Sequence, residues 1–119
     1  MKSLALSLVA VMLLSPAANA DEAARAKRDA KSLRDMTNRA VAFLQNQGQA
    51  EDGSFSKESG IGITALVATA MMKNGVSPDH PSVAKALDFL KQFVQPTGGI
   101  HQPETRYRNY ETSLAILCF

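Results

Sequence analysis

Three side chains of the chain offer metal-ligand or nucleophile chemistry: His80, His101 and Cys118. Compact zinc sites take such ligands from closely spaced pairs. The residues here are 21 and 17 positions apart, and these spacings match no compact zinc pattern. We therefore expect no metal site and no cofactor, with His80 capping a helix, His101 in a loop and Cys118 a small buried residue.

Acidic residues could supply general acid–base chemistry, but they are scattered along this chain. No two aspartates are adjacent or one residue apart. The sequence therefore contains no visible catalytic constellation, and we predict no catalytic residue within it.

One cluster, Arg106, Tyr107, Asn109 and Tyr110, could form a rim that binds a ligand, because it combines aromatic faces with hydrogen-bonding groups. The alternative is that Tyr110 only packs against the start of a helix, as apolar residues at helix starts commonly do. The sequence leaves both interpretations open.

Residues 1–20 are typical of an export signal. Lys2 is followed by an apolar run from Leu4 to Leu14, and Ala18-Asn19-Ala20 is a small-x-small cleavage site. We predict cleavage after Ala20 and export to the periplasm or the medium. The alternative is an uncleaved anchor, although the apolar run is shorter than the roughly 20 residues of a membrane-spanning helix. After cleavage we expect no stable membrane span.

The net charge of the chain limits the kinds of partner that it can bind. The formal net charge is +2 and falls to +1 once Lys2 is removed. A balance so close to neutral argues against nucleic-acid binding, which depends on many basic contacts.

The residues after the leader predict an all-α fold. Residues 21–36 are a charged helical lead-in, and residues 37–119 form the repeat region. Hydrophobic periodicity predicts four helices, at residues 23–47, 63–73, 81–93 and 110–119. The second is apolar on nearly every side, so we expect it to be buried on every side.

The repeat region contains two similar units. Residues 39–45 (RAVAFLQ) match residues 85–91 (KALDFLK) at an offset of 46, and Thr64 matches Thr112 at an offset of 48. Each unit combines an amphipathic helix, a glycine-containing loop and an apolar helix. Such units bury their apolar faces only against neighbours. The period excludes tetratricopeptide and ankyrin repeats but leaves HEAT or armadillo repeats open.

Residues 39–55, which include the end of the first helix and part of the loop after it, resemble the "QW" motif of squalene and hopene cyclases, with Ala40 replacing a glycine and Phe55 replacing the tryptophan. The second copy has Phe93 where the motif has glutamine. The chain is thus similar to the broader prenyltransferase/squalene-oxidase (terpenoid cyclase-like) repeat family. The residues that carry this resemblance, all with expected structural roles, are Phe43, Gln47, Gly53, Phe55, Thr64, Phe89, Gly98, Gly99 and Thr112. We expect Gln47 to hydrogen-bond backbone groups left free at the next helix start. We expect the hydroxyls of Thr64 and Thr112 to satisfy free N–H groups near the starts of their own helices.

The resemblance implies an α/α-toroid of helical hairpins, whose loops at inner-helix starts surround a central cavity. It favours an exported binding or scaffold domain with an apolar ligand or a protein partner. The alternative is a fragment of a cyclase-like or prenyltransferase-like enzyme, with active residues beyond residue 119. Because the chain stops within an apolar run ending at Phe119, we expect it to be a fragment.

Overall fold

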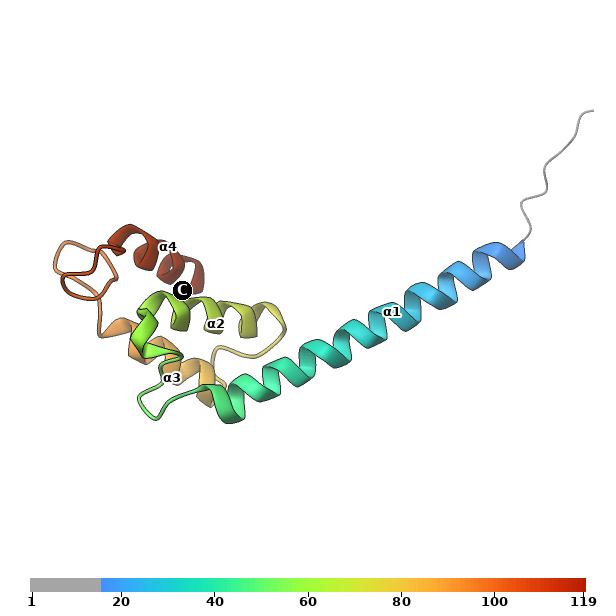
Figure 1. Cartoon of the computed structure of the whole chain (residues 1–119), viewed down its shortest axis with the longest axis horizontal. Helices are drawn as coiled ribbons and strands as arrows, with labels where there is room; N and C mark the ends of the chain where they lie inside the picture. The colour runs from blue at the N-terminus through green and yellow to red at the C-terminus, as the bar shows by residue number, and fades with distance from the viewer. Residues whose placement is uncertain (1–15) are drawn as a thin grey trace, which may run out of the picture. The chain divides into compact units, whose positions relative to one another are not determined.

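The computed structural model describes residues 16–119, apart from the side chains of residues 16–19 and Lys57. Over these residues the chain is all-α, as predicted, and contains no strand. Figure 1 shows its four α-helices: α1 (Pro16–Phe43), α2 (Ile61–Lys73), α3 (Pro81–Lys91) and α4 (Arg108–Cys118). A π-helical turn, η1 (Leu44–Gly48), follows α1, and a 3-10 turn, η2 (Lys57–Ser59), precedes α2.

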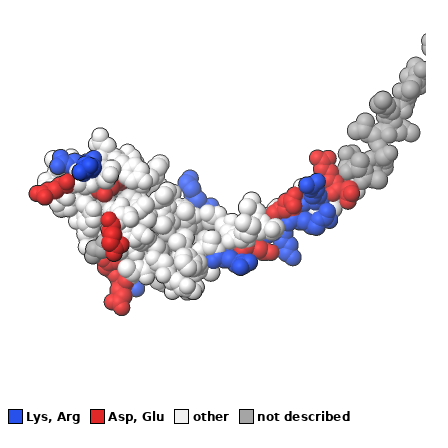
Figure 2. All heavy atoms as spheres, in the orientation of Figure 1, with Lys and Arg blue, Asp and Glu red and all other residues white. Residues whose placement is uncertain are grey.

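The chain divides into two compact units between Asp35 and Met36. In the first unit, the described side chains of α1 are almost all exposed, and both charge signs alternate along it (Figure 2). Such a segment is helical through intrinsic propensity and solvated charge rather than through packing. The apolar side chain of Leu33 is exposed as well.

The leader falls largely on residues 1–15, which lie outside the described residues. The described part of α1 begins at Pro16, where a residue without an N–H suits a first helical position. Export and cleavage after Ala20 therefore stay predictions. No helix within residues 16–119 has the length and hydropathy needed to cross a bilayer.

In the second unit, α2 is the central element and lies close to both α3 and α4. Side chains from these helices and from the loop before α2 share one core. Its buried members are Phe55, Ile61, Ala65, Ala68, Met71, Val83, Ala86, Phe89, Leu90 and Cys118.

The prediction that the second helix is buried on every side is wrong. Ile61, Ala65 and Met71 are buried, but Leu66 is 48% exposed and Ala70 is also exposed. The reason is tertiary: within the described residues α3 and α4 are the helices that lie close to α2, and they leave Leu66 and Ala70 exposed.

The start of α3 follows the predicted chemistry. His80 is its N-cap, and its Nδ1 accepts a hydrogen bond from the Ser82 N–H at 3.3 Å. Pro81 is the first helical residue, where the missing N–H leaves no bond unmade. The helix ends at Lys91, two residues before the predicted end, because Gln92 and Phe93 bond to carbonyls three residues back.

Candidate functional site

Two loops of the second unit, the first before α2 (residues 49–60) and the second before α4 (residues 92–107), contain the same hydrogen-bonded turn. In each loop a glycine has a left-handed backbone, Gly53 with φ +91° and Gly98 with φ +88°, a conformation that favours glycine. Equivalent backbone hydrogen bonds close the two turns: Ala50 N–H to Ser54 O (2.9 Å) with Gly53 N–H to Ala50 O (3.0 Å), and Gln95 N–H to Gly99 O (2.7 Å) with Gly98 N–H to Gln95 O (2.8 Å).

In each loop, the backbone N–H and C=O of one residue both hydrogen-bond to the side-chain hydroxyl of a threonine in the following helix. Thr64 Oγ1 accepts from the Phe55 N–H at 2.9 Å and donates to the Phe55 carbonyl at 3.3 Å. Thr112 Oγ1 accepts from the Ile100 N–H at 3.1 Å and donates to the Ile100 carbonyl at 3.2 Å. We call these two arrangements the threonine clamps.

The threonine clamps correct one expected role. The sequence predicted that these hydroxyls satisfy free N–H groups at the starts of their own helices. Instead, each hydroxyl serves a residue of the preceding loop, nine positions earlier for Thr64 and twelve for Thr112. An isolated loop residue has no helix or sheet to satisfy its backbone groups, so the hydroxyl replaces those partners.

The role predicted for Gln47 belongs to a different glutamine. Gln47 is exposed, whereas the side-chain amides of Gln49 and Gln95 each donate to two backbone carbonyls. These two glutamines are 46 residues apart, the same offset as the helices, and that spacing was a signal in the sequence. The acceptors are Gly53 O (3.0 Å) and Ser82 O (2.7 Å) for Gln49, and Phe93 O (3.1 Å) and His101 O (2.9 Å) for Gln95.

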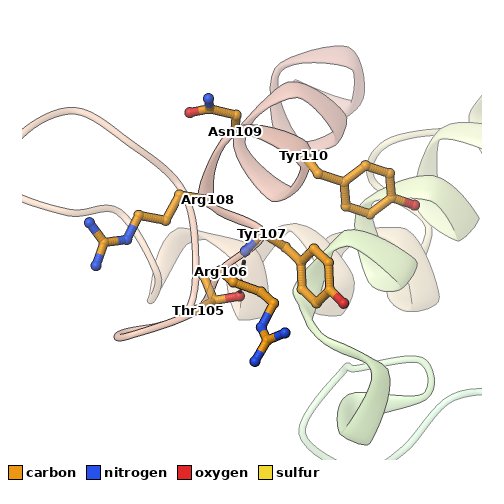
Figure 3. A pocket seen from close by; sticks show the side chains of 6 residues that line it. All are labelled: Thr105, Arg106, Tyr107, Arg108, Asn109 and Tyr110. Carbon is orange, nitrogen blue, oxygen red and sulfur yellow. Dashed lines mark hydrogen bonds between the residues drawn. The ribbon is translucent and has the colours of Figure 1, made fainter.

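The candidate rim lies at the start of α4, where residues 105–110 line an open hollow of about 620 Å³. Figure 3 shows that the side chains spread outward: Arg106 and Tyr107 point to one side, whereas Arg108 and Asn109 point away from them. The Tyr107 N–H donates to Thr105 Oγ1 at 3.1 Å. The four predicted rim residues are thus adjacent, but they do not converge on one cavity.

The two interpretations of Tyr110 both have support in its surroundings. Its ring lies against the start of α2, where a Cβ on Gly62 would come within 3.1 Å of it. The side chain is nevertheless exposed over about half of its surface. Tyr110 therefore packs the helix start and also contributes a face to the surface.

A smaller hollow of about 280 Å³ lies beside the rim and draws residues from three elements. It is lined by Glu58 and Gly60 near η2, Gln102 of the second loop, and Tyr107 and Glu111 at α4. We call it the inter-loop hollow. Unlike the rim, it lies between separate segments of the chain.

Glu111 is the residue that sequence reasoning left without a role. Its side chain is 3% exposed, and its Oε2 accepts from the Gln102 N–H at 2.8 Å. A carboxylate can accept about four hydrogen bonds. It can therefore receive a further donor from a ligand in the inter-loop hollow. The sequence signal was a carboxylate directly before the clamp threonine Thr112.

The three candidate metal or nucleophile residues lie apart. His80 caps α3, and His101 lies in the second loop with its Nδ1 2.8 Å from the Gln102 carbonyl oxygen. Cys118 is buried; burial raises the pKa of its thiol, and a hydrogen bond with Thr69 opposes that rise. Within residues 16–119, no three His, Cys, Asp or Glu side chains are grouped to hold a metal ion.

Comparisons with known proteins add no relative: no family model, curated protein or solved structure matches the chain. The resemblance to prenyltransferase/squalene-oxidase repeats therefore stays a prediction that depends on the residues themselves.

Proposed function

We propose that this chain is an exported binding module built from α/α-toroid hairpins of the prenyltransferase/squalene-oxidase type. Two observations support the repeat design. Both loops use the same left-handed glycine turn, and both are held by a threonine clamp. Two unrelated loops would have little reason to share a pattern of four backbone and side-chain hydrogen bonds.

The binding role depends on one observation: Tyr107 stands between two hollows and is 60% exposed. The core aromatics Phe55 and Phe89 are almost fully buried, so the chain does bury aromatic rings elsewhere. Exposed aromatic residues beside a depression commonly provide most of the binding energy at a recognition surface.

The ligand class follows from the two walls of the inter-loop hollow. The Tyr107 ring offers an apolar face, and the Glu111 carboxylate can accept a hydrogen bond from the ligand. An apolar molecule with one terminal hydroxyl, such as an isoprenoid alcohol, can pack against the Tyr107 ring and donate a hydrogen bond to the Glu111 carboxylate. This agrees with the apolar ligands that the family resemblance implies.

The chain carries its own reporter for a binding experiment. It has two tyrosines and no tryptophan, and both tyrosines lie at the rim. We expect titration with farnesol to change tyrosine emission saturably. Tyr107→Ala should weaken the apparent affinity about tenfold, close to 1.4 kcal/mol, whereas Phe119→Ala should leave it unchanged. Emission that does not respond to farnesol would contradict the proposed ligand class.

Export is a separate part of the proposal. If cleavage follows Ala20, then Asp21 and Glu22 become the first residues of the mature α1 helix. Acidic residues in a first helical turn are favourable, because they face the positive end of the helix dipole. Expression in a bacterial host, followed by N-terminal sequencing of the periplasmic fraction, should give a chain that starts at Asp21. An intact Met1 in that fraction would contradict cleavage.

The alternative, an enzyme with active residues outside this sequence, stays a prediction. It would be favoured by turnover of an isoprenoid substrate, measured as product formation, in a longer chain that contains these hairpins.

A further inference from the structure

A further hollow, of about 260 Å³, lies where the first loop meets the start of α3. We call it the α3 hollow. One of its walls includes Gln49 and Glu51 of the first loop, and the other includes Ser82 and Lys85 of α3. It has no lining residue in common with the rim or with the inter-loop hollow.

Ser82 has one polar group that the fold leaves unused. The residue is 7% exposed; its N–H donates to His80 Nδ1 at 3.3 Å, and its carbonyl accepts from Gln49 Nε2 at 2.7 Å. Among the described residues, none hydrogen-bonds to the Ser82 hydroxyl. Every fully buried side-chain oxygen or nitrogen of these residues has a partner, so this hydroxyl reaches the surface, at the α3 hollow that Ser82 lines. Polar groups of buried residues are normally partnered, so an available hydroxyl here points to a ligand.

The two walls are held together before any ligand binds. The Gln49 amide donates to Gly53 O of the first loop at 3.0 Å and to Ser82 O of α3 at 2.7 Å. Gly53 also lies directly against the backbone of Lys85, where a Cβ would overlap the carbonyl. A site with walls already in place loses little conformational entropy when it binds a ligand.

The two walls carry opposite charges. The Lys85 ammonium lies on the α3 wall, where the helix start adds a positive partial charge, and the Glu51 carboxylate lies on the loop wall. Both side chains are exposed, and neither forms an ion pair with a described residue. A simple anion would be attracted by one wall and repelled by the other. The α3 hollow therefore suits a ligand that carries both charges.

We propose that the α3 hollow binds a small zwitterion, a free α-amino acid. The carboxylate of the ligand accepts hydrogen bonds from the Ser82 hydroxyl and the Lys85 ammonium, and its ammonium group donates to the Glu51 carboxylate. These charge-assisted bonds are stronger than those between neutral groups. The hollow of about 260 Å³ has room for a small amino acid such as glycine.

Titration of the full chain, followed by amide chemical shifts in NMR spectra, tests this proposal with three probes. Glycine should shift the Ser82 and Glu51 amides saturably. Acetate and methylammonium each carry only one of the two charges, so each should bind at least about tenfold more weakly than glycine. The absence of a saturable glycine shift would overturn the proposal, and so would acetate that binds as tightly as glycine.

Variants of the two walls separate the two charges. Glu51→Gln should weaken glycine binding about tenfold without weakening acetate binding, and Lys85→Gln should weaken glycine binding equally without weakening methylammonium binding. Both side chains are exposed, so the fold tolerates these changes. A Glu51→Gln chain that binds glycine as tightly as the wild type would contradict the role of the loop wall.

The Ser82 hydroxyl has its own test. Ser82→Ala keeps the backbone bonds of Ser82 and should weaken the binding of both glycine and acetate about tenfold, because both lose a hydrogen bond to a charged group. Ser113→Ala, at an exposed serine outside the hollow, is the matched control and should bind glycine like the wild type. Equal glycine affinity in the two variants would show that the Ser82 hydroxyl does not contact the ligand.

The α3 hollow and the proposed isoprenoid site can fail separately. Tyr107→Ala changes neither wall of the α3 hollow, so it should weaken farnesol binding and leave the glycine shifts unchanged. Glycine binding without a response to farnesol would remove the proposed isoprenoid ligand and keep this inference, whereas the reverse result would remove this inference alone.

Discussion

The two loops of the second unit share one hydrogen-bond pattern but differ in how tightly they are packed. In the first loop, Phe55 and Thr64 are fully buried, whereas their counterparts Ile100 and Thr112 in the second are only partly buried. The first loop lies against the next amphipathic helix, since a Cβ on Gly53 would overlap the carbonyl of Lys85 in α3. The second loop has no such cover. The turn is therefore set locally, and its burial depends on the following hairpin.

The largest difference between the loops is expected at their glycines. Gly53→Ala forces an L-residue into a left-handed backbone and also pushes a methyl group into α3, for a total cost of about 3 kcal/mol. Gly98→Ala has the same backbone penalty but open space around it, so we expect about 1 kcal/mol. Urea denaturation of both variants measures this contrast, and equal losses would show that the first loop is not held against α3.

The threonine clamps should give the next largest difference. Thr64→Val keeps the side-chain shape but leaves the buried N–H and carbonyl of Phe55 without partners, at a cost of about 2 kcal/mol. Thr112→Val should cost about 1 kcal/mol, because water can reach the backbone groups of Ile100, which is only partly buried.

A matched control for the clamps is Ser113→Ala. The Ser113 hydroxyl only donates to the Asn109 carbonyl one turn earlier in α4, and its loss should change the free energy of unfolding by less than about 0.5 kcal/mol. A Thr112→Val loss no larger than the Ser113→Ala loss would mean that the second clamp contributes nothing to stability.

Cys118 should give the smallest effect, visible only in alkali. Burial raises the pKa of its thiol above the ordinary value of 9.0, so the folded state retains a proton that the unfolded state releases. The stabilisation is complete below pH 9.0 and is lost as the pH rises through the folded-state pKa. We expect the urea midpoint of the wild type to fall more between pH 8 and pH 10 than that of Cys118→Ala, and parallel profiles would contradict this assignment.

Much of the fold could be predicted because helices obey short-range rules. The periodic apolar residues located all four helices, and the His80-Pro81 pair located the start of α3. The burial of α2 was over-predicted because composition reports how apolar a helix is, not how many neighbours cover it. Leu66 is exposed for that tertiary reason.

The candidate site was harder to predict because loop partners are set by three-dimensional packing. The offset of 48 paired Thr64 with Thr112, but their hydrogen-bond partners lie in loops whose path depends on tertiary packing. Glu111 was passed over because its burial depends on the backbone N–H of Gln102, which donates a hydrogen bond to the Glu111 carboxylate from a distant loop. The role of Gln49 could have been predicted, because Gln49 and Gln95 are separated by the same number of residues as the two matching helices.

Amide hydrogen exchange at Phe55 and Ile100 tests most directly whether the two loops follow one design. Both N–H groups donate to a threonine hydroxyl, so both should exchange slowly in the native chain. Thr64→Val should remove protection at Phe55 alone, and Thr112→Val at Ile100 alone, while the helical amides stay protected. Rapid exchange at Ile100 in the unsubstituted chain would contradict a shared design.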